Sequence, residues 1–405
     1  MGKPVYTLPQ IINQIDSGLT WATSTVTFSI PGTAPDPGSP EAAGFTQMTP
    51  VMKALAAEAY GMWGDLIASK LLQVATGGQM TFAYSSDAAL GGGTYTGTSY
   101  SGTHLVSAHS WFDKAWTSQS TDASVQHGQY GYLTYLHEIG HAFGLNHPGP
   151  YNGTGTYSTD AVYQQDTHRY TVMSYFDGNA DGSATNWYKN GIWYYPETPM
   201  VDDVATIQHM YGASLTTRAG DTVYGFHATA DRSVYNFATN TTPVLTIWDS
   251  GGNNTIDLSG YTTAQRLDLH QGAYSSVAGM TNNLGIAFGT IIQTGIGGSG
   301  NDIIVGNYFN DTLYGGAGND HLYAGHGNSA LYGGAGNDTL VAGAGSDTLY
   351  GGAGTDTVVF GLNQSQYTVV HAGDHWTVAD KTGHAGVATL YSVEKLQFHD
   401  HSMLI

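Results

Sequence analysis

The sequence predicts an α+β domain followed by an all-β domain that winds into a parallel β-roll. Two observations carry this prediction. Helical and strand-like patterns alternate up to residue 215, whereas Thr, Asn, Gly and short β-branched runs dominate the chain beyond it. A nine-residue repeat then fills positions 297–359 without an insertion. A chain of 405 residues has room for two or three domains, each with its own core.

The expected domain boundaries follow these changes of composition. We expect a first domain at 1–215, a β-rich start of the C-terminal domain at 216–296, the repeats at 297–359 and a final β segment at 360–405. The last boundary is the point at which the nine-residue period ends.

The first domain shows helical patterns on both sides of strand-like stretches. Apolar side chains recur near helical spacing over 48–75 and again over 129–144. Gly144 offers a stop for the second helix, because glycine readily adopts the left-handed conformation found at helix ends. The stretches 80–84 and 105–112 predict a sheet between the two helices.

The composition excludes several classes of partner. Eleven Lys and Arg against 31 Asp and Glu give a formal net charge of −20, which disfavours nucleic acid and anionic lipid. Positions 267–380 contain nine Asp and no Lys or Arg, so dissolved cations must neutralise them. The chain has no Cys, so metal ligands must be His, carboxylate or carbonyl groups. No apolar run approaches the roughly 18 residues of a membrane span, and we expect no membrane insertion.

The seven repeats have the pattern of a solenoid core. Each unit has six turn residues rich in Gly, followed by three strand residues. A flexible Gly-rich linker would not keep an aliphatic residue in one phase, and we expect these side chains to stack inward. The eighth position is always aliphatic: Ile304, Leu313, Leu322, Leu331, Leu340, Leu349 and Val358.

The turns of the repeats predict calcium sites. Carboxylate and carbonyl oxygens are the ligands that calcium prefers, and the unit resembles the RTX repeat of calcium-binding parallel rolls. The candidate ligands are the sixth-position carboxylates and the first-position glycines of the complete units: Asp302, Asp311, Asp320, Asp338, Asp347, Asp356, Gly297, Gly315, Gly333 and Gly351.

Successive turns should alternate between the two edges of the roll, and the two edges differ in sequence. Units one, three, five and seven keep the full Gly and Asp pattern, whereas Asn307, Phe309, Ala324, Ser329 and Ala342 interrupt the even units. We therefore predict well-formed calcium sites on the odd edge and weaker ones on the even edge. Because the acidic turns surround a thin core, we expect ion binding and folding of the roll to be one event.

Residues 137–148, HEIGHAFGLNHP, predict a catalytic zinc site. His137 and His141 lie one helical turn apart, and a turn at Gly144 would deliver His147 as a third ligand. Three neutral nitrogens leave a coordination position for water, and Glu138 is placed to take its proton. An inert structural zinc site would be expected to close that position with a fourth protein ligand.

The extended motif resembles the metzincin signature, and YTVMSY at 170–175 resembles the Met-turn that follows it. Together with VDDVATIQHMYGA at 201–213 and the RTX repeats, it is similar to the serralysins, bacterial metalloproteases that join a metzincin catalytic domain to an RTX roll. The likeness extends over nearly the full chain. It implies that Met173 packs beneath the zinc histidines. It also implies that Tyr175 is a fifth zinc ligand that swings away to stabilise the oxyanion.

The same resemblance implies calcium ligands outside the repeats and a route of export. Asn254 stands where serralysins usually carry Asp, which weakens one of these sites. Family members leave the cell by type I secretion with an uncleaved C-terminal signal, here expected within 360–405. The implied calcium ligands are Arg218, Gly220, Asp249, Gly251 and Asp257.

We thus predict a secreted, monomeric zinc endopeptidase, stabilised by several calcium ions, that acts on proteins or peptides and uses the type I secretion apparatus. A non-enzymatic RTX surface or adhesion protein with an inactive zinc site is the alternative, because RTX repeats accompany many activities. A processing protease dedicated to one partner is a narrower version of the enzyme hypothesis. Asp202 and Asp203 are interpreted mainly as first-turn helix carboxylates, and orientation of the active site is the alternative role. The strand at 105–111 is a candidate edge for an extended substrate.

Overall fold

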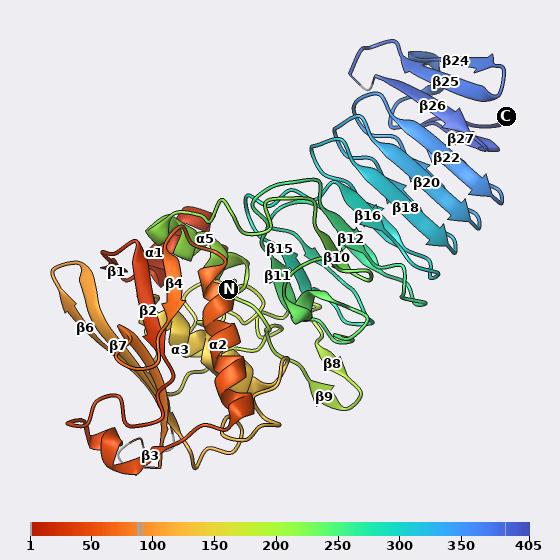
Figure 1. Cartoon of the computed structure of the whole chain (residues 1–405). Coiled ribbons are helices and arrows are strands. Elements are labelled where there is room, and N and C mark those ends of the chain that lie inside the picture. Colours follow the sequence, from red (N-terminus) through yellow and green to blue (C-terminus); the bar gives the residue numbers. More distant parts are fainter. Residues whose placement is uncertain (1, 87–89, 91–92, 385) are drawn as a thin grey trace. The chain divides into compact units, whose positions relative to one another are not determined.

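The computed structural model describes residues 2–86, 90, 93–384 and 386–405, and the chain divides into two compact units (Figure 1). The first unit contains Met1–Thr217 and Val244–Trp248. The second contains Arg218–Pro243 and Asp249–Ile405. The short return of the chain at 244–248 had no signal in the sequence, and the finer boundaries at 296 and 359 remain predictions.

The first unit is built on a mostly parallel sheet. The strand order is β1-β7-β5-β2-β4, with β3 antiparallel to β5 and β6 antiparallel to β7. The strands are β1 (Thr20–Trp21), β2 (Thr25–Ser29), β3 (Phe45–Thr46), β4 (Lys70–Gln73), β5 (Met80–Ser85), β6 (Thr94–Ser101) and β7 (His104–Asp113).

The helices of this unit pack through an aromatic core. The ring of Phe82 on β5 lies 4.3 Å from that of Phe112 on β7 and 4.8 Å from that of Tyr135 on α3, between ring centroids. All three side chains are fully buried, so they anchor α3 against the sheet. The remaining elements are α1 (Leu8–Ile15), η1 (Pro40–Gly44), α2 (Pro50–Gly64), α3 (Tyr130–Ala142), α4 (Tyr157–Asp160), β8 (Tyr188–Lys189), β9 (Ile192–Trp193), α5 (Val201–Tyr211) and β11 (Leu245–Ile247).

The helix predicted over 48–75 is wrong in its second half. The structure ends α2 at Gly64, and the chain from Lys70 forms β4. Leu71, which lies within the predicted helix, pairs in register with Val26 of β2. Strand pairing with a distant segment therefore overrides a local helical spacing.

The edge strand is also different from the one expected. β7 contains the predicted stretch 105–111, but it pairs with β6 on one side and with β1 and β5 on the other. Within the described residues, β6 has β7 as its only strand partner and is the outer strand beside α3. The sequence could not distinguish the two, because a polar strand such as β6 lacks the apolar alternation of a half-buried one.

The second unit is a parallel roll of two facing sheets (Figure 1). One sheet has the order β10-β12-β16-β18-β20-β22-β26-β25-β24, and the other β13-β17-β19-β21-β23-β27-β28. The predicted fold class is confirmed. The elements are β10 (Val223–Gly225), η3 (Ser233–Tyr235), β12 (Thr255–Asp257), β13 (Arg266–Asp268), β14 (Tyr274–Ser275), β15 (Leu284–Ile286), β16 (Thr294–Ile296), β17 (Ile303–Val305), β18 (Thr312–Ala317), β19 (His321–Tyr323), β20 (Ala330–Ala335), β21 (Thr339–Val341), β22 (Thr348–Ala353), β23 (Thr357–Val359), η4 (Gln364–Gln366), β24 (Tyr367–Ala372), β25 (His375–Asp380), β26 (Val387–Tyr391), β27 (Lys395–Gln397) and β28 (Ser402–Leu404).

The core of the roll is one side chain wide. Every eighth-position aliphatic residue of the repeats is at most 1% exposed, and Leu313, Leu331 and Leu349 lie in register on adjacent strands. The turns require glycine, because a methyl group on Gly334 would collide with the Gly316 carbonyl and its φ is +110°. In the described part of the chain, no helix has the length and apolar character needed to cross a membrane.

Candidate metal centre and active site

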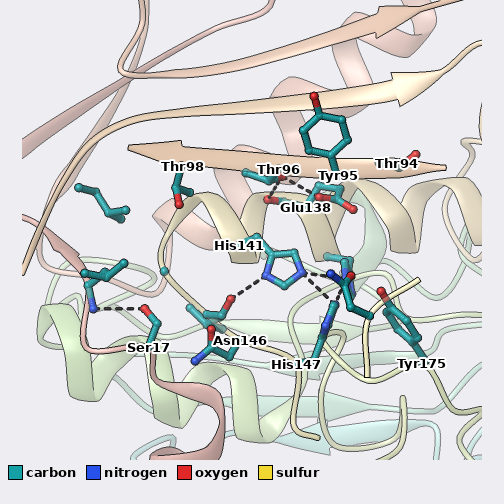
Figure 2. Close-up of a pocket in the computed structure, with 16 residues that line it drawn as sticks. Ser17, Thr94, Tyr95, Thr96, Thr98, Glu138, His141, Asn146, His147 and Tyr175 are labelled. Carbon is teal, nitrogen blue, oxygen red and sulfur yellow. Dashed lines mark hydrogen bonds between the residues drawn. The ribbon is translucent and has the colours of Figure 1, made fainter. Parts of the chain in front are cut away.

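The helix α3 and the turn after it bring three histidines together. His137 and His141 lie on α3, which ends where Gly144 adopts a φ of +91°. A side chain on Gly144 would collide with the Leu19 carbonyl, so only glycine allows this close turn. The chain then reverses and places His147 against the other two rings, with Nε2–Nε2 separations of 3.0–3.1 Å (Figure 2).

Backbone carbonyls determine the tautomer of all three rings. The Nδ1 atom of His137 lies 2.8 Å from the Val172 carbonyl, that of His141 lies 2.7 Å from the Leu145 carbonyl, and that of His147 lies 2.9 Å from the Tyr151 carbonyl. Each Nδ1 must carry the proton to donate to a carbonyl, which leaves the Nε2 lone pairs facing one another. The Nε2 contacts are therefore not hydrogen bonds, and three converging lone pairs make a cradle for a cation.

This donor set fits zinc. Zinc–nitrogen bonds are about 2.0–2.1 Å long, so one ion can contact three nitrogens spaced in this way. Burial, followed by the neighbouring histidines, lowers the pKa of His137 well below its ordinary value and that of His141 to about 3. The pKa of His147 is lowered by burial as well. Among the described residues, the cluster has no fourth His or carboxylate ligand, and the open coordination position stays a prediction.

Glu138 is buried next to the first histidine and is held by a hydroxyl group. The Thr96 hydroxyl lies 2.7 Å from Glu138 Oε2 and donates to it across the space between β6 and α3 (Figure 2). Burial raises the pKa of Glu138 to about 7, and the Thr96 hydrogen bond opposes this shift. A carboxyl group that titrates near neutrality can both accept and release a proton.

Thr96 is a site residue that the sequence analysis missed. The alternation Thr94, Thr96 and Thr98 would have indicated a strand with one hydroxyl-bearing face. It would not have indicated that this face meets α3. These three side chains line a cavity of about 540 Å³ together with Glu138 and the histidines.

Tyr175 lies beside the histidines. Its ring centroid is 4.6 Å from that of His147, and its hydroxyl oxygen accepts a hydrogen bond of 3.2 Å from the Gly153 N–H. Burial raises the pKa of Tyr175, so the phenol remains protonated. The structure thus places Tyr175 at the site, while its role as a fifth ligand stays a prediction.

Met173 packs against the helix that carries the histidines. Its side chain is fully buried, and a methyl group on Gly140 of α3 would lie 2.5 Å from the Met173 sulfur atom. Met173 thus lies against α3, while its predicted position beneath the zinc histidines themselves stays a prediction. Gly140 is required because α3 and the Met-turn approach so closely at this point.

Asp203 holds the Met-turn in place. Its carboxylate accepts hydrogen bonds from the Thr171 hydroxyl at 2.6 Å, the Val172 N–H at 2.7 Å and the Met200 N–H at 2.8 Å. The Val172 carbonyl in turn orients His137. Asp202 and Asp203 do lie in the first turn of α5, but the helix dipole alone does not account for Asp203, which is buried and links α5 to the metal cradle.

A second cavity of about 620 Å³ opens at the same residues. It shares Thr94, His137, Glu138 and Tyr175 with the first cavity. Its other lining residues include Trp116, Tyr130, Leu133 and His168. The candidate metal cradle therefore borders two hollows, one along β6 and one that is richer in aromatic side chains.

On the odd edge of the roll, three of the four repeat carboxylates have one buried oxygen without a hydrogen-bond partner. The Oδ2 atoms of Asp320, Asp338 and Asp356 are buried without a hydrogen bond, and these side chains are at most 1% exposed. Each faces the glycine that opens its own turn, where a methyl group would collide with the oxygen. Unpartnered buried carboxylate oxygens beside carbonyl groups are the environment that calcium favours.

The other repeat carboxylates are engaged differently. Asp302 accepts from Gln265 N–H and Gly298 N–H, and Asp347 accepts from Ser329 N–H and Gly343 N–H. One carboxylate oxygen of Asp311 accepts a hydrogen bond from the Asn307 N–H, and the other oxygen is buried without a hydrogen-bond partner. Gly297 opens its turn in the same way as Gly315, Gly333 and Gly351 do.

The predicted ligands outside the repeats are close together but satisfied internally. Asp249 accepts from the Tyr224 hydroxyl and the Gly251 N–H, and Asp257 accepts from the Ser259 N–H. The Asn254 amide donates to the carbonyls of Gly251 and Ile291, so it cross-links the segment where a carboxylate was expected.

The two remaining predicted ligands lie nearby in the chain. Arg218 has a φ of +49° and its guanidinium contacts Asp231 at 2.7 Å, while the Gly220 carbonyl accepts from the Thr222 hydroxyl at 3.0 Å.

A three-histidine cradle with a neighbouring glutamate and a Met-turn, followed by a Gly- and Asp-rich parallel roll, defines a metallopeptidase class with an RTX-type C-terminal domain. Residues 94–206 match the family model described as metallo-peptidase family M12B, reprolysin-like, and residues 213–401 match peptidase M10 serralysin C terminal. Over these two ranges the chain resembles the serralysin-type metalloproteases.

Curated relatives agree with this assignment. The chain is 37% identical to Metalloprotease AprA of Pseudomonas entomophila over 329 residues, which are 77% of this chain and 66% of that protein. It is 38% identical to Serralysin B of Dickeya chrysanthemi over 273 residues, which are 65% of this chain and 54% of that protein. The chain thus spans just under two thirds of the first relative and about half of the second.

Proposed function

We propose that the protein is a secreted zinc endopeptidase that cleaves proteins or peptides and is stabilised by calcium. The observation that carries this proposal is the convergence of three unprotonated Nε2 atoms beside the buried carboxyl of Glu138. His137, His141 and His147 would hold the zinc ion. When bound there, zinc polarises the scissile carbonyl and lowers the pKa of water.

Glu138 acts as the general base in this proposal. Thr96 holds Oε2, so Oε1 is the oxygen that takes a proton from the attacking water and returns it to the leaving amine. A pKa of about 7 suits both transfers, because a base works best when its pKa is near the operating pH.

Tyr175 supports the developing oxyanion. Its hydroxyl oxygen accepts from the Gly153 N–H, which leaves the phenol proton available for donation to substrate oxygen. An extended substrate would pair antiparallel with the outer strand β6, whose Thr94, Thr96 and Thr98 line the cavity.

The roll serves stability and export in the same proposal. Its acidic turns would remain largely unfolded in the calcium-poor producing cell and would fold on reaching external calcium. Passage through the type I secretion apparatus with a C-terminal signal is compatible with this order of events. The match to the peptidase M10 serralysin C-terminal model and the unpartnered carboxylate oxygens of the odd edge support the calcium dependence.

The variant Glu138→Gln tests the catalytic proposal. We expect casein cleavage to fall at least roughly 100-fold while one zinc ion per chain remains bound, since the histidine cradle is unchanged. Glu58→Gln is the control, because it makes the same chemical change on α2, where Glu58 contacts His127. This variant should retain activity. Glu138→Gln with more than a few per cent of activity at full zinc content would contradict the role of Glu138.

The non-enzymatic RTX surface protein remains the second candidate, and a gelatin zymogram with and without a zinc chelator separates the two. Clearing that disappears with the chelator supports the peptidase. A dedicated processing protease would clear gelatin poorly and would cut only one sequence in a peptide library.

A further inference from the structure

The hydrogen-bond ladder of the odd edge continues beyond the last repeat. In the repeats, the N–H of each sixth-position Asp donates to Oδ1 of the Asp in the next odd turn. Asp302 donates to Asp320, Asp320 to Asp338, and Asp338 to Asp356. The N–O distances are 2.7–2.8 Å. The N–H of Asp356 then donates to Glu394 Oε2 at 2.7 Å. Glu394 thus occupies the place of a further repeat carboxylate, although it lies outside the nine-residue pattern.

The segment around Glu394 forms an additional rung of the roll. Tyr391 pairs with Tyr350 in register, and their rings stack with centroids 4.8 Å apart. Lys395 pairs with Thr357 on the opposite sheet and donates its N–H to the Asp356 carbonyl at 3.0 Å. Residues 392–394 therefore make the same edge turn as residues 351–356, with half the length.

This short turn also supplies a carbonyl in the position of a repeat glycine. A methyl group on Gly333 would collide with Asp338 Oδ2 and the Gly351 carbonyl. A methyl group on Gly351 would collide with Asp356 Oδ2 and the Ser392 carbonyl. Asp356 Oδ2 is buried and has no hydrogen-bond partner, and the side chain is 0% exposed.

We propose that Asp356, the Ser392 carbonyl and Glu394 form a calcium site that closes the odd edge of the roll. The proposal rests on the calcium dependence given under the proposed function. Oxygen donors of two carboxylates and a carbonyl suit calcium, and the extra methylene of Glu relative to Asp gives the reach that a three-residue turn needs. Ser392 has a φ of +48°, an unfavourable conformation for serine that is maintained where the surroundings demand it.

The charge pattern supports the same site. Burial raises the pKa of Asp356, and the charges of Asp338 and Glu394 raise it further. Without a cation, these carboxylates repel one another at the end of the roll. With a cation, the terminal turn is joined to the rest of the roll, and the site acts as a cap.

Calcium binding to the full chain tests the site without reference to catalysis. Glu394→Gln keeps an oxygen that can accept from Asp356 N–H but removes the charge. We expect it to bind one calcium ion fewer by isothermal titration and to raise the calcium midpoint of folding, followed by circular dichroism, roughly threefold or more. Asp374→Asn removes a charge from a side chain that is 87% exposed and should change neither value.

A double-mutant comparison decides whether the two carboxylates share one ion. Asp356→Asn and Glu394→Gln should each remove one ion, and the double variant should also remove only one. An unchanged stoichiometry in Glu394→Gln, or the loss of two ions in the double variant, would overturn the shared site. A parent chain that binds no calcium would overturn both this site and the calcium part of the proposed function. If the parent chain binds calcium, the result for Glu394→Gln bears on this site alone and not on the proposed function.

Because a cap variant could fail to reach the folded state, Ser392→Gly provides a second test. It keeps the carbonyl and relieves the positive φ, so calcium stoichiometry should equal that of the parent, with a midpoint that is equal or lower. A loss of one ion in Ser392→Gly would assign the ligand to the hydroxyl and overturn the site as drawn.

Discussion

The two candidate metal-binding regions of the molecule differ in the charge of their donor groups and in the direction in which burial shifts the donor pKa. In the first unit the donors are neutral imidazoles, each oriented by a backbone carbonyl, and burial lowers the pKa of their rings. On the odd edge of the roll the donors are carboxylates, and burial raises the pKa of Asp320 to about 7. The histidine cradle is therefore already in its binding form, whereas the roll contains charges that only a cation or a proton can compensate.

Calcium removal should give the largest difference in stability between the two units. At pH 8 a calcium chelator should unfold most of the second unit, because each occupied site contributes about 4 kcal/mol when calcium exceeds its Kd 1,000-fold. Far-ultraviolet circular dichroism measures the loss of β-structure. Strand signal that survives chelation unchanged would show that the apolar stack alone supports the roll.

Asp203→Asn should disturb the histidine cradle next most strongly. The amide cannot accept all three hydrogen bonds from the Met-turn and Met200, and bonds to a charged group are worth about 1.5–3 kcal/mol each. We expect kcat to fall about tenfold or more with a smaller change in KM, since Asp203 acts through Val172 and His137.

The calcium midpoint of roll folding serves as the control for this variant and should not change. Equal losses of zinc affinity and calcium affinity would indicate general unfolding instead of a positioning role.

The pH dependence of the stability of the roll should change sign when calcium is removed. Burial raises the folded pKa of Asp311 and Asp320 to about 7, above the ordinary value of 3.8. The calcium-free folded form therefore binds more protons than the unfolded chain, and its stability falls as pH rises from about 4 through 7. With calcium, protons compete with the ion, so stability should rise over the same range.

Thermal melts at pH 5 and pH 8 in calcium measure the slope with calcium, with an expected shift of roughly 5 °C. The β-structure signal that the calcium-free chain retains at pH 5 but not at pH 8 measures the opposite slope. Slopes of the same sign in both conditions would contradict the role of these carboxylates.

Thr96→Val should have the smallest effect. Loss of the hydroxyl removes a hydrogen bond that stabilises the Glu138 carboxylate, so the pKa of Glu138 should rise. Because the base must be ionised, kcat/KM should fall about threefold to tenfold at pH 6 and less at pH 9. Thr96→Ser retains the hydroxyl and should behave like the parent. A loss that is independent of pH would assign Thr96 to substrate binding.

Local chemistry explains what could be predicted. The spacing of His137 and His141, the stop at Gly144 and the aliphatic phase of the repeats each involve neighbours within one helical turn or one repeat unit. Such signals survive in the sequence because nearby residues determine them. The sequence did not indicate Thr96 or Glu394, and it favoured a helix-end role for Asp203 over its contact with the Met-turn. Each of these residues acts on a partner that is 42, 38 or 31 positions away in the chain, respectively.

The sequence by itself determined the metallopeptidase motif, the Met-turn and the parallel roll, because periodic and short-range patterns specify backbone form directly. Only the tertiary structure decided which strand lies at the edge, where α2 ends and β4 begins, and which distant oxygen faces Glu138 or Asp356. Those outcomes depend on contacts between segments that have no fixed separation, so the physical cause is packing in three dimensions, which local preference does not encode.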